Sequence, residues 1–210
     1  MPCTVYQLGL IDYSEAYRLQ RELLNKRLNN EIEDVLLLLE HPPVLTIGKS
    51  GSLDNVLISR EQLAQKGISL FFIDRGGDVT YHGPGQIVGY PIINLKHIGR
   101  NLHQFVYDLE EVLLRTLYDF SIEAHRDSSH RGVWTEGAEI AAIGLRVMKW
   151  VSMHGFALNV NTDLEPFRLI NPCGLVKGKA TSMAQILGRN VPPEAVTASM
   201  IRHFSEVFCP

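Results

Sequence analysis

Arg75-Gly-Gly-Asp-Val-Thr-Tyr-His-Gly-Pro-Gly-Gln86 lies between two apolar runs, Leu70–Ile73 and Ile87–Ile93. Its glycines and its proline exclude one regular helix or strand over the whole stretch. The remaining side chains include Arg, Thr, Tyr, His and Gln, which bind polar or anionic groups. We therefore predict two strands joined by a loop that presents functional groups from a sheet. A plain hairpin turn is the alternative, although such turns need only about two to five residues.

A second turn lies near the C-terminal third of the chain, at Asn171-Pro-Cys-Gly-Leu175. Cys173 stands between a proline and a glycine, which indicates a turn rather than a packed helix or strand. A thiol in such a position is accessible, and with a lowered pKa it becomes a nucleophile. A structural free cysteine is the alternative interpretation of this turn.

The composition sets the class of protein. The 210 residues are enough for one domain with a full core, so we expect a single domain over residues 1–210. The net charge of −3 argues against a surface for nucleic acid or anionic membranes. Cysteines at positions 3, 173 and 209 form no CxxC pair, which favours a reducing cytoplasm. We recognise no signal peptide and no apolar run long enough to span a membrane.

Hydrophobic periodicity predicts several strands and a few long helices. Asp12 and Glu15 indicate a helix start, Asn101 caps a second long helix, and Pro192-Pro193 opens a last one. Besides the runs that flank the glycine-rich loop, we predict strands over residues 35–39, 44–47, 120–124, 140–147 and 151–160. This pattern indicates an α+β (mixed α/β) class, with a mixed sheet covered by helices.

Four motifs together resemble the lipoyl(octanoyl) transferase family. They are Arg75–His82 with Gly83–Gln86, Ile140–Val147, His154–Asn159 and Asn171–Gly174, and they occur in the family's order. The resemblance runs over nearly the whole chain. It implies the fold shared by biotin protein ligases and lipoate ligases, with a larger mixed-sheet part and a small subdomain.

The family resemblance also implies the reaction. An octanoyl (or lipoyl) group passes from acyl carrier protein to the catalytic Cys173, and then to a lysine of a lipoyl domain. Acceptors are the lipoyl domains of 2-oxoacid dehydrogenases and the glycine cleavage H protein. We expect no cofactor, no metal ion, no nucleic acid and no membrane as partners. Cys3 and Cys209 are expected to be incidental thiols.

Three stretches match the family's substrate-binding positions. Glycine N–H groups in the loop are expected to donate hydrogen bonds to the thioester oxygen, an oxyanion-type role. His82 is expected to hydrogen-bond the acyl carbonyl or the thiol, and a structural histidine is the alternative. Small residues beside Ile143 and Phe156 are expected to form a narrow apolar slot for an acyl tail. His154 is expected to be a positioning residue rather than a metal ligand. The implied residues are Arg75, Gly76, Gly77, Asp78, Val79, Thr80, Tyr81, His82, Ala142, Ile143, Gly144, Gly155, Phe156 and Ala157.

One position departs from the family pattern. The family has a lysine, paired with the catalytic cysteine, where this chain has Glu139. A lysine lowers the thiol pKa, whereas a carboxylate opposes the thiolate by an energy on the order of 4 kcal/mol for unit charges about 4 Å apart. Protonation of Glu139 would reduce that penalty, and Lys149, Lys177 and Lys179 are alternative cations.

The departure leaves a second interpretation open, a catalytically weakened or silent acyl-binding member of the fold. A third interpretation is an ATP-dependent lipoate or biotin ligase. Against it, the chain has no P-loop motif, and an adenylating enzyme needs no cysteine nucleophile.

Overall fold

The computed structural model describes residues 3–127, 130–171 and 180–209. Within these residues the strands form two sheets, with the orders β1-β2-β6-β10-β9-β8-β7 and β4-β3-β5. The strands of the larger sheet are β1 (Cys3–Leu10), β2 (Asp34–Glu40), β6 (Gln86–Ile92), β7 (His125–Arg126), β8 (Gly132–Thr135), β9 (Ala138–Met148) and β10 (Val151–Asn159). Those of the smaller sheet are β3 (Val44–Ile47), β4 (Ser69–Phe72) and β5 (Val79–His82).

The larger sheet is mixed, as the sequence predicts. β1 runs parallel to β2, and the other neighbouring strands of this sheet are antiparallel. β2 is buried over nearly its whole length because the Val35–Leu39 run has helices on both faces of the sheet. The predicted strands over residues 35–39, 44–47, 140–147 and 151–160 are confirmed to within a few residues.

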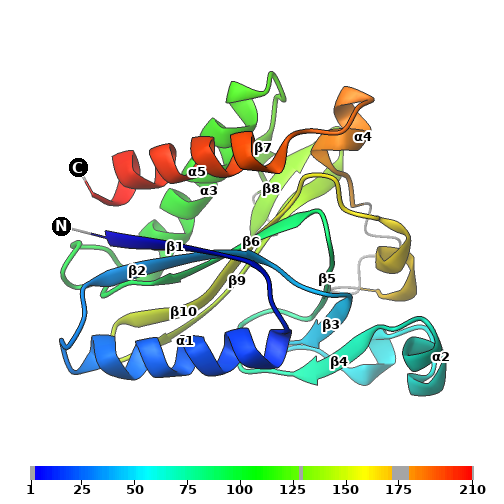
Figure 1. Cartoon of the computed structure of the whole chain (residues 1–210), viewed down its shortest axis with the longest axis horizontal. Helices are drawn as coiled ribbons and strands as arrows, with labels where there is room; N and C mark the ends of the chain where they lie inside the picture. The colour runs from blue at the N-terminus through cyan, green and yellow to red at the C-terminus, as the bar shows by residue number, and fades with distance from the viewer. Residues whose placement is uncertain (1–2, 128–129, 172–179, 210) are drawn as a thin grey trace.

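Helices cover both faces of the larger sheet. Helix α1 (Tyr13–Leu28) lies on one face, and α3 (Leu102–Asp119) and α5 (Pro193–Phe208) pack together on the other (Figure 1). Each face has its own buried cluster: Leu37, Val88 and Met153 pack toward α1, whereas Leu36, Ile87 and Leu158 pack toward α3 and α5. This alternation follows from the two-residue period of a strand. Shorter helices are α2 (Arg60–Gln65), α4 (Met183–Leu187) and the 3₁₀ turns η1 (Leu53–Asn55) and η2 (Glu165–Leu169).

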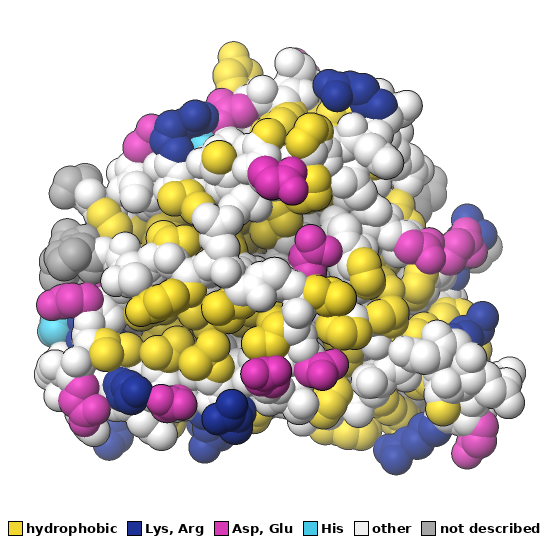
Figure 2. Space-filling view, in the orientation of Figure 1, with side chains coloured by type: hydrophobic (Ala, Val, Ile, Leu, Met, Phe, Trp, Pro, Cys, Tyr) yellow, Lys and Arg dark blue, Asp and Glu magenta, His cyan; other side chains and the backbone are white. Residues whose placement is uncertain are grey.

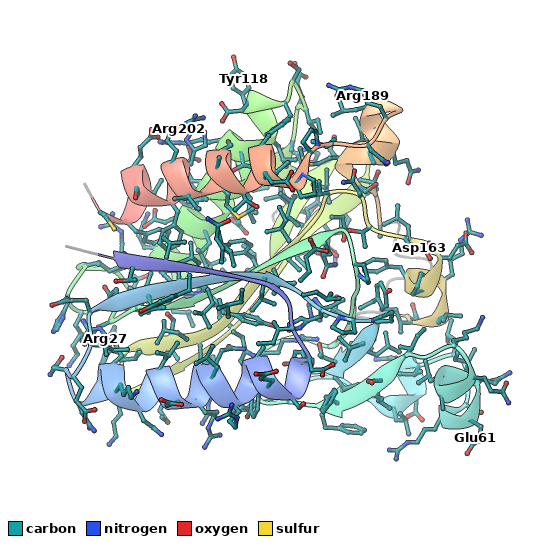
Figure 3. The ribbon with its side chains drawn as sticks, in the orientation of Figure 1. Arg27, Glu61, Tyr118, Asp163, Arg189 and Arg202 are labelled. Atoms are coloured by element: carbon teal, nitrogen blue, oxygen red, sulfur yellow. The ribbon has the colours of Figure 1, made fainter. Side chains whose placement is uncertain are left out.

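Local signals explain where the long helices begin and end. The Asn101 side chain accepts a hydrogen bond from the Gln104 amide at 2.9 Å, so the predicted cap of α3 is confirmed. Asp12 precedes α1 as predicted, but its side chain makes no capping hydrogen bond. At the other end of α1 the buried Arg27 (Figure 3) donates to Asp34 at 2.7 Å, which ties the helix to the start of β2.

The strand predicted over residues 120–124 is wrong. Helix α3 continues to Asp119, and Ser121 then adopts a left-handed backbone with φ of 60°. Pairing with β8 begins only at His125, opposite Trp134. The apolar residues Phe120, Ile122 and Ala124 pack against the core of the α3 and α5 face as a turn rather than as a strand.

The glycine-rich stretch is not one loop between two paired strands. Residues 79–82 form β5, which pairs with β3 in the smaller sheet, and β6 then begins at Gln86 in the larger sheet. The chain therefore crosses from one sheet to the other within the stretch. A turn residue is needed at the crossing, and Gly85 has φ of 81° with the Asn161 backbone so close that a Cβ would meet it at 2.7 Å.

The surface around the open edge of the larger sheet is partly apolar. Figure 2 shows apolar side chains gathered over α1 and the adjoining edge of the sheet. Tyr6 and Leu10 of the edge strand β1 are 47% and 61% exposed. Among the described residues, no helix combines the length and the apolar character needed to cross a membrane.

Candidate active site

Two adjoining cavities lie where the smaller sheet meets the larger one. The larger cavity measures about 410 Å³ and the smaller about 60 Å³. Both are lined by Arg75, Thr80, Ala142, Ile143 and Gly144, which therefore form a shared wall. Of the predicted site residues that the structure describes, every one except Tyr81 lines at least one of the two cavities.

The larger cavity carries the polar and charged groups. Its lining includes Arg75, Asp78, His130, Arg131 and Glu139. Its apolar lining is Val79, Leu102, Val106, Trp134, Ile143, Leu145, Phe167 and Ile170. Residues from β5, β8, β9, α3 and η2 thus converge on one space.

The smaller cavity has a mostly apolar lining. Ile73, Val88, Gly155, Phe156 and Ala157 contribute alongside the shared wall. Its polar lining residues beyond that wall are Tyr13, His82, Tyr90 and His154. Glycine is required at Gly155, because a Cβ there would lie 2.0 Å from the Gly89 carbonyl oxygen. Ile143 and Phe156, beside which the sequence predicts a slot, both line this cavity, and its occupation by an acyl tail stays a prediction.

Arg75 is anchored to the smaller sheet. Its Nη2 donates to the Thr46 carbonyl at 2.8 Å and to the Thr46 hydroxyl at 3.0 Å, and its Nη1 donates to the Gly76 carbonyl at 3.0 Å. The side chain is buried and packs so close to β9 that a Cβ on Gly144 would meet its Cδ at 2.9 Å. A positive charge is therefore held between the two cavities.

The two loop glycines differ in structure. The Gly76 N–H donates to the Leu145 carbonyl at 2.9 Å, so the oxyanion role expected for this amide is wrong. The amide is used to pin the loop to β9. Gly77 has φ of 88°, a conformation in which an L side chain is strained. The oxyanion role of the Gly77 N–H stays a prediction.

Strand β5 divides its residues between two sides. Thr80 and His82 face the cavities, whereas Tyr81 packs edge-on against Phe167 with ring centroids 5.4 Å apart and lines neither cavity. The two-residue period of a strand explains the difference, and it makes Tyr81 a core residue of the smaller sheet. Asp78 holds the loop: its carboxylate accepts from the Val79 N–H at 2.7 Å and from Asn55 Nδ2 at 2.6 Å.

Glu139 lines the larger cavity from β9. Burial raises the pKa of Glu139 to about 7, although the nearby Arg75 charge acts in the opposite direction. The carboxyl group is thus partly protonated at neutral pH, which reduces the penalty expected from the sequence. Its backbone pairs with the chain beyond the second turn motif, since the Thr181 N–H donates to the Glu139 carbonyl at 2.9 Å.

Cys173, Lys177 and Lys179 lie outside the described residues. Ile170 and Ala180, which lie within two residues of the segment that contains them on either side, both line the larger cavity. The Asn171 N–H donates to the Asn55 carbonyl at 2.8 Å, and Ala180 bridges to Glu139. Lys149 is exposed in the turn between β9 and β10 and lines neither cavity.

The other two cysteines are far from these cavities in the fold. Cys3 in β1 and Cys209 after α5 are partly buried and pack against the core of the α3 and α5 face. Burial raises the pKa of Cys3 to about 12, and the neighbouring Cys209 adds to that effect. The Cys3 thiol is therefore protonated and inert at neutral pH.

His154 is held from two directions. The ring Nε2 of His154 lies 2.9 Å from Asp74 Oδ1. The backbone N–H of His154 donates to Gln20 Oε1 at 2.9 Å. Asp74 in turn forms an ion pair with Arg146. Burial lowers the pKa of His154. The described residues contain no group of three or more His, Cys, Asp and Glu side chains arranged to hold a metal ion.

Sequence reasoning misses several lining residues, and it also misses His41, which lines neither cavity but contacts Tyr13, His82 and Tyr90. Tyr13 and His41 belong to helix α1 and to the turn after β2, and their rings pack at 5.1 Å. Tyr90 approaches them from β6, with its hydroxyl 2.7 Å from His41 Nε2. Trp134, His130 and Arg131 complete one side of the larger cavity. No local pattern marks these residues, because their common location arises from contacts between distant segments.

Comparison with known proteins agrees with this architecture. Residues 12–205 match the model of the lipoyl protein ligase A/B catalytic domain. An octanoyltransferase of Caldicellulosiruptor saccharolyticus is 50% identical, over 99% of this chain and 89% of the relative. The bi-partite lipoate protein ligase of Thermoplasma acidophilum superposes with a TM-score of 0.77 at 15% identity, over 99% of this chain and 84% of that one.

A biotin protein ligase of Aquifex aeolicus, solved with biotin and ATP, has the same fold, with a TM-score of 0.61 at 16% identity, over 98% of this chain and 70% of that one. The fold predicted from the resemblance is therefore confirmed. The extent of the family match and the 50% identity over nearly the full length show that the chain belongs to the octanoyltransferases of the lipoyl protein ligase A/B family.

Proposed function

We propose that residues 1–210 act as one catalytic unit that transfers octanoyl from acyl carrier protein to a lysine of a lipoyl domain. As an octanoyltransferase the chain is an acyltransferase of protein lipoylation. Its proposed acceptors are the lipoyl domains of 2-oxoacid dehydrogenases and the glycine cleavage H protein. The cysteine pattern favours a reducing compartment, so we assign the reaction to the cytoplasm.

The reaction proceeds in two steps. The Cys173 thiolate attacks the donor thioester, forms a new thioester and releases the carrier thiol. The neutral amine of the acceptor lysine then attacks, forms the amide and returns the Cys173 thiol. The first step exchanges one thioester for another, and the second is driven by the greater stability of the amide.

One observation supports this proposal most. Cys173 belongs to the segment between Asn171 and Ala180, and both Ile170, next to Asn171, and Ala180 line the larger cavity. That cavity shares the wall of Arg75, Thr80 and Ala142–Gly144 with the smaller apolar cavity. An acyl group on Cys173 thus has a place for its tail.

The acyl tail is assigned to the wall that the two cavities share, with only its end in the smaller cavity, because about 60 Å³ does not hold all of its methylene and methyl groups. Burying seven methylene and methyl groups contributes on the order of 5 kcal/mol at about 0.8 kcal/mol each, enough to select chain length. The predicted residues Ala142, Ile143, Gly144, Gly155, Phe156 and Ala157 all line the smaller cavity.

A weakened or silent acyl-binding protein is the second candidate, and Glu139 is the observation that favours it. Its carboxyl group lines the same cavity in place of the family lysine. Because the pKa of Glu139 is raised to about 7, the protonated fraction falls as the pH rises and opposition to a nearby thiolate grows. A silent binder would bind the octanoyl donor and leave Cys173 unmodified.

The test is octanoyl transfer from octanoyl-acyl carrier protein to an isolated lipoyl domain, without ATP. The wild-type chain should modify the domain, Cys173→Ser should abolish transfer, and the matched variant Cys209→Ser should retain it. Transfer that depends on added ATP would favour a ligase, and transfer by Cys173→Ser at the wild-type rate would exclude the thioester route.

A further inference from the structure

A chain of buried amides connects His82 to the backbone beyond the second turn motif. His82 Nδ1 lies 2.8 Å from Gln86 Oε1. Gln86 Nε2 lies 2.9 Å from Asn159 Oδ1 and 3.2 Å from the Tyr81 carbonyl. Asn159 Nδ2 lies 3.0 Å from the Thr181 carbonyl. All three side chains are at least nine-tenths buried.

The direction of every hydrogen bond in this chain follows from its last member. The Thr181 carbonyl only accepts, so the Asn159 amide must present its NH₂ group there and its oxygen to Gln86. Gln86 then donates through Nε2 to Asn159 and to the Tyr81 carbonyl, which leaves Oε1 as the atom that faces His82. An amide oxygen accepts, so His82 Nδ1 must carry the hydrogen.

The other ring nitrogen of His82, Nε2, is available to a ligand in the smaller cavity. The ring lines the smaller cavity, and within residues 3–127, 130–171 and 180–209 its Nε2 makes no hydrogen bond. Burial lowers the pKa of His82 to about 3, and the neighbouring His41 reinforces the effect. The ring is therefore neutral at physiological pH, and Nε2 presents a lone pair.

A donor without a partner lies beside this acceptor. The Tyr13 hydroxyl is buried and has no hydrogen-bond partner among the described residues. Tyr13 is 4% exposed, lines the same cavity and stacks on His82 with ring centroids 6.4 Å apart. A buried hydroxyl without a hydrogen-bond partner is unfavourable, which indicates a ligand atom at this place.

We infer that Gln86 and Asn159 are positioning residues that lock His82 as its Nδ1–H tautomer, so that His82 Nε2 and the Tyr13 hydroxyl form an acceptor–donor pair inside the smaller cavity. The pair binds a neutral group that both accepts and donates, such as a hydroxyl on an acyl chain. This consequence rests on the proposed function, because it takes the smaller cavity as the site of the end of the acyl tail. The tautomer itself does not.

The first experiment reads the tautomer without any activity. The ring nitrogen signals of His82 in ¹⁵N-histidine-labelled protein, assigned by their loss in His82→Gln, should show Nδ1 protonated and Nε2 bare. The near-isosteric Gln86→Met and Asn159→Leu remove two links of the chain and should each mix the tautomers. The inference would be overturned if the wild-type signals showed Nε2 protonated. It would also be overturned if both variants gave the same His82 signals as the wild type. The wild-type spectrum alone decides if neither variant folds.

Asn161→Leu is the matched control. Asn161 also exchanges two hydrogen bonds with one backbone partner, Val191, at 2.8 and 2.9 Å, but it does not touch the chain that ends at His82. This variant should lose comparable stability and leave the His82 signals unchanged. Mixed tautomers in Asn161→Leu would show that the signals report loosened packing, which would contradict the positioning role.

The second experiment tests the acceptor–donor pair with 8-hydroxyoctanoyl and octanoyl thioesters of carrier protein in competition. Tyr13→Phe should reduce the use of the hydroxylated chain relative to octanoyl by a few-fold to about tenfold, the range of one hydrogen bond. An unchanged ratio with active enzyme would remove Tyr13 from the pair. Loss of all transfer in the wild type would contradict the proposed function and leave the tautomer result standing.

Discussion

The two cavities share a wall but differ in what surrounds a ligand. The larger one is bordered by the charged groups of Arg75, Arg131 and Glu139 and by Ile170 and Ala180, which flank the segment that contains Cys173. The smaller one is lined mainly by aliphatic and aromatic carbon, with neutral histidines and tyrosines at one side. We propose that the two cavities have different roles: the charged groups of the larger one act on the reacting atoms, and the smaller one selects the end of the acyl tail.

The largest expected effect comes from enlarging a residue of the wall that the two cavities share. Ala142 lines both of them, so Ala142→Leu should block the acyl tail while leaving the larger cavity open. Losing about four buried carbon groups at about 0.8 kcal/mol each should reduce octanoyl transfer on the order of 10²-fold, with less effect on butyryl. The measurement is the ratio of octanoyl to butyryl transfer.

Val106→Leu is the control for chain-length selection. Val106 lines the larger cavity only, so its enlargement should leave the octanoyl-to-butyryl ratio unchanged. Equal shifts in Ala142→Leu and Val106→Leu would break the distinction between the two cavities.

The next effect concerns charge in the larger cavity. The pKa of Glu139 is raised from 4.5 to about 7, so the folded chain keeps a proton that the unfolded chain releases as the pH rises through this window. The folded state therefore loses stability as the pH rises from 4.5 to about 7, and the full cost of the buried carboxylate is present above that pH. Glu139→Gln should relieve a penalty on the order of 3 kcal/mol at pH 8 and little at pH 4.5.

Urea unfolding of Glu139→Gln and the wild type at both pH values measures this difference. Glu33→Gln, at an exposed position outside the helices and strands, is the control, and its effect on stability should differ far less between the two pH values. A Glu139→Gln gain that is the same at pH 4.5 and pH 8 would mean that the cavity does not disfavour the carboxylate.

The smallest expected effect separates the two loop glycines. Gly77→Ala should destabilise the chain by about 1–2 kcal/mol, because its φ is 88° and a Cβ would lie 3.2 Å from Arg75 Nη1. Gly76→Ala should cost less, since the nearest atom to its Cβ is the Leu145 oxygen at 3.4 Å. Thermal or urea unfolding of both variants gives the comparison, and equal losses would contradict the assigned backbone conformations.

Sequence reasoning succeeds where a signal is local. The apolar run 35–39 predicts β2, and the Asn101 side chain caps α3 as expected. It fails at residues 120–124, where apolar composition alone does not reveal that no partner strand is available before His125. It also fails within the glycine-rich stretch, where β5 belongs to a different sheet from β6.

The site shows the same limit. The motifs identify the shared wall, but Tyr81 lies inside one of them and faces the core, because strand alternation is invisible when the strand itself is unrecognised. Tyr13 and His41 reach the smaller cavity and its border from segments far away in the chain, and nothing in their local sequence indicates that. The raised pKa of Glu139 likewise depends on burial that only the fold provides.

The most direct test of the account is intact mass spectrometry of the chain incubated with octanoyl-acyl carrier protein, followed by addition of a lipoyl domain. We predict one octanoyl adduct that maps to Cys173, and its disappearance as the octanoyl mass appears on a lysine of the added domain. An adduct on Cys3 or Cys209, or domain modification with no adduct on the chain at any time, would contradict the central claim.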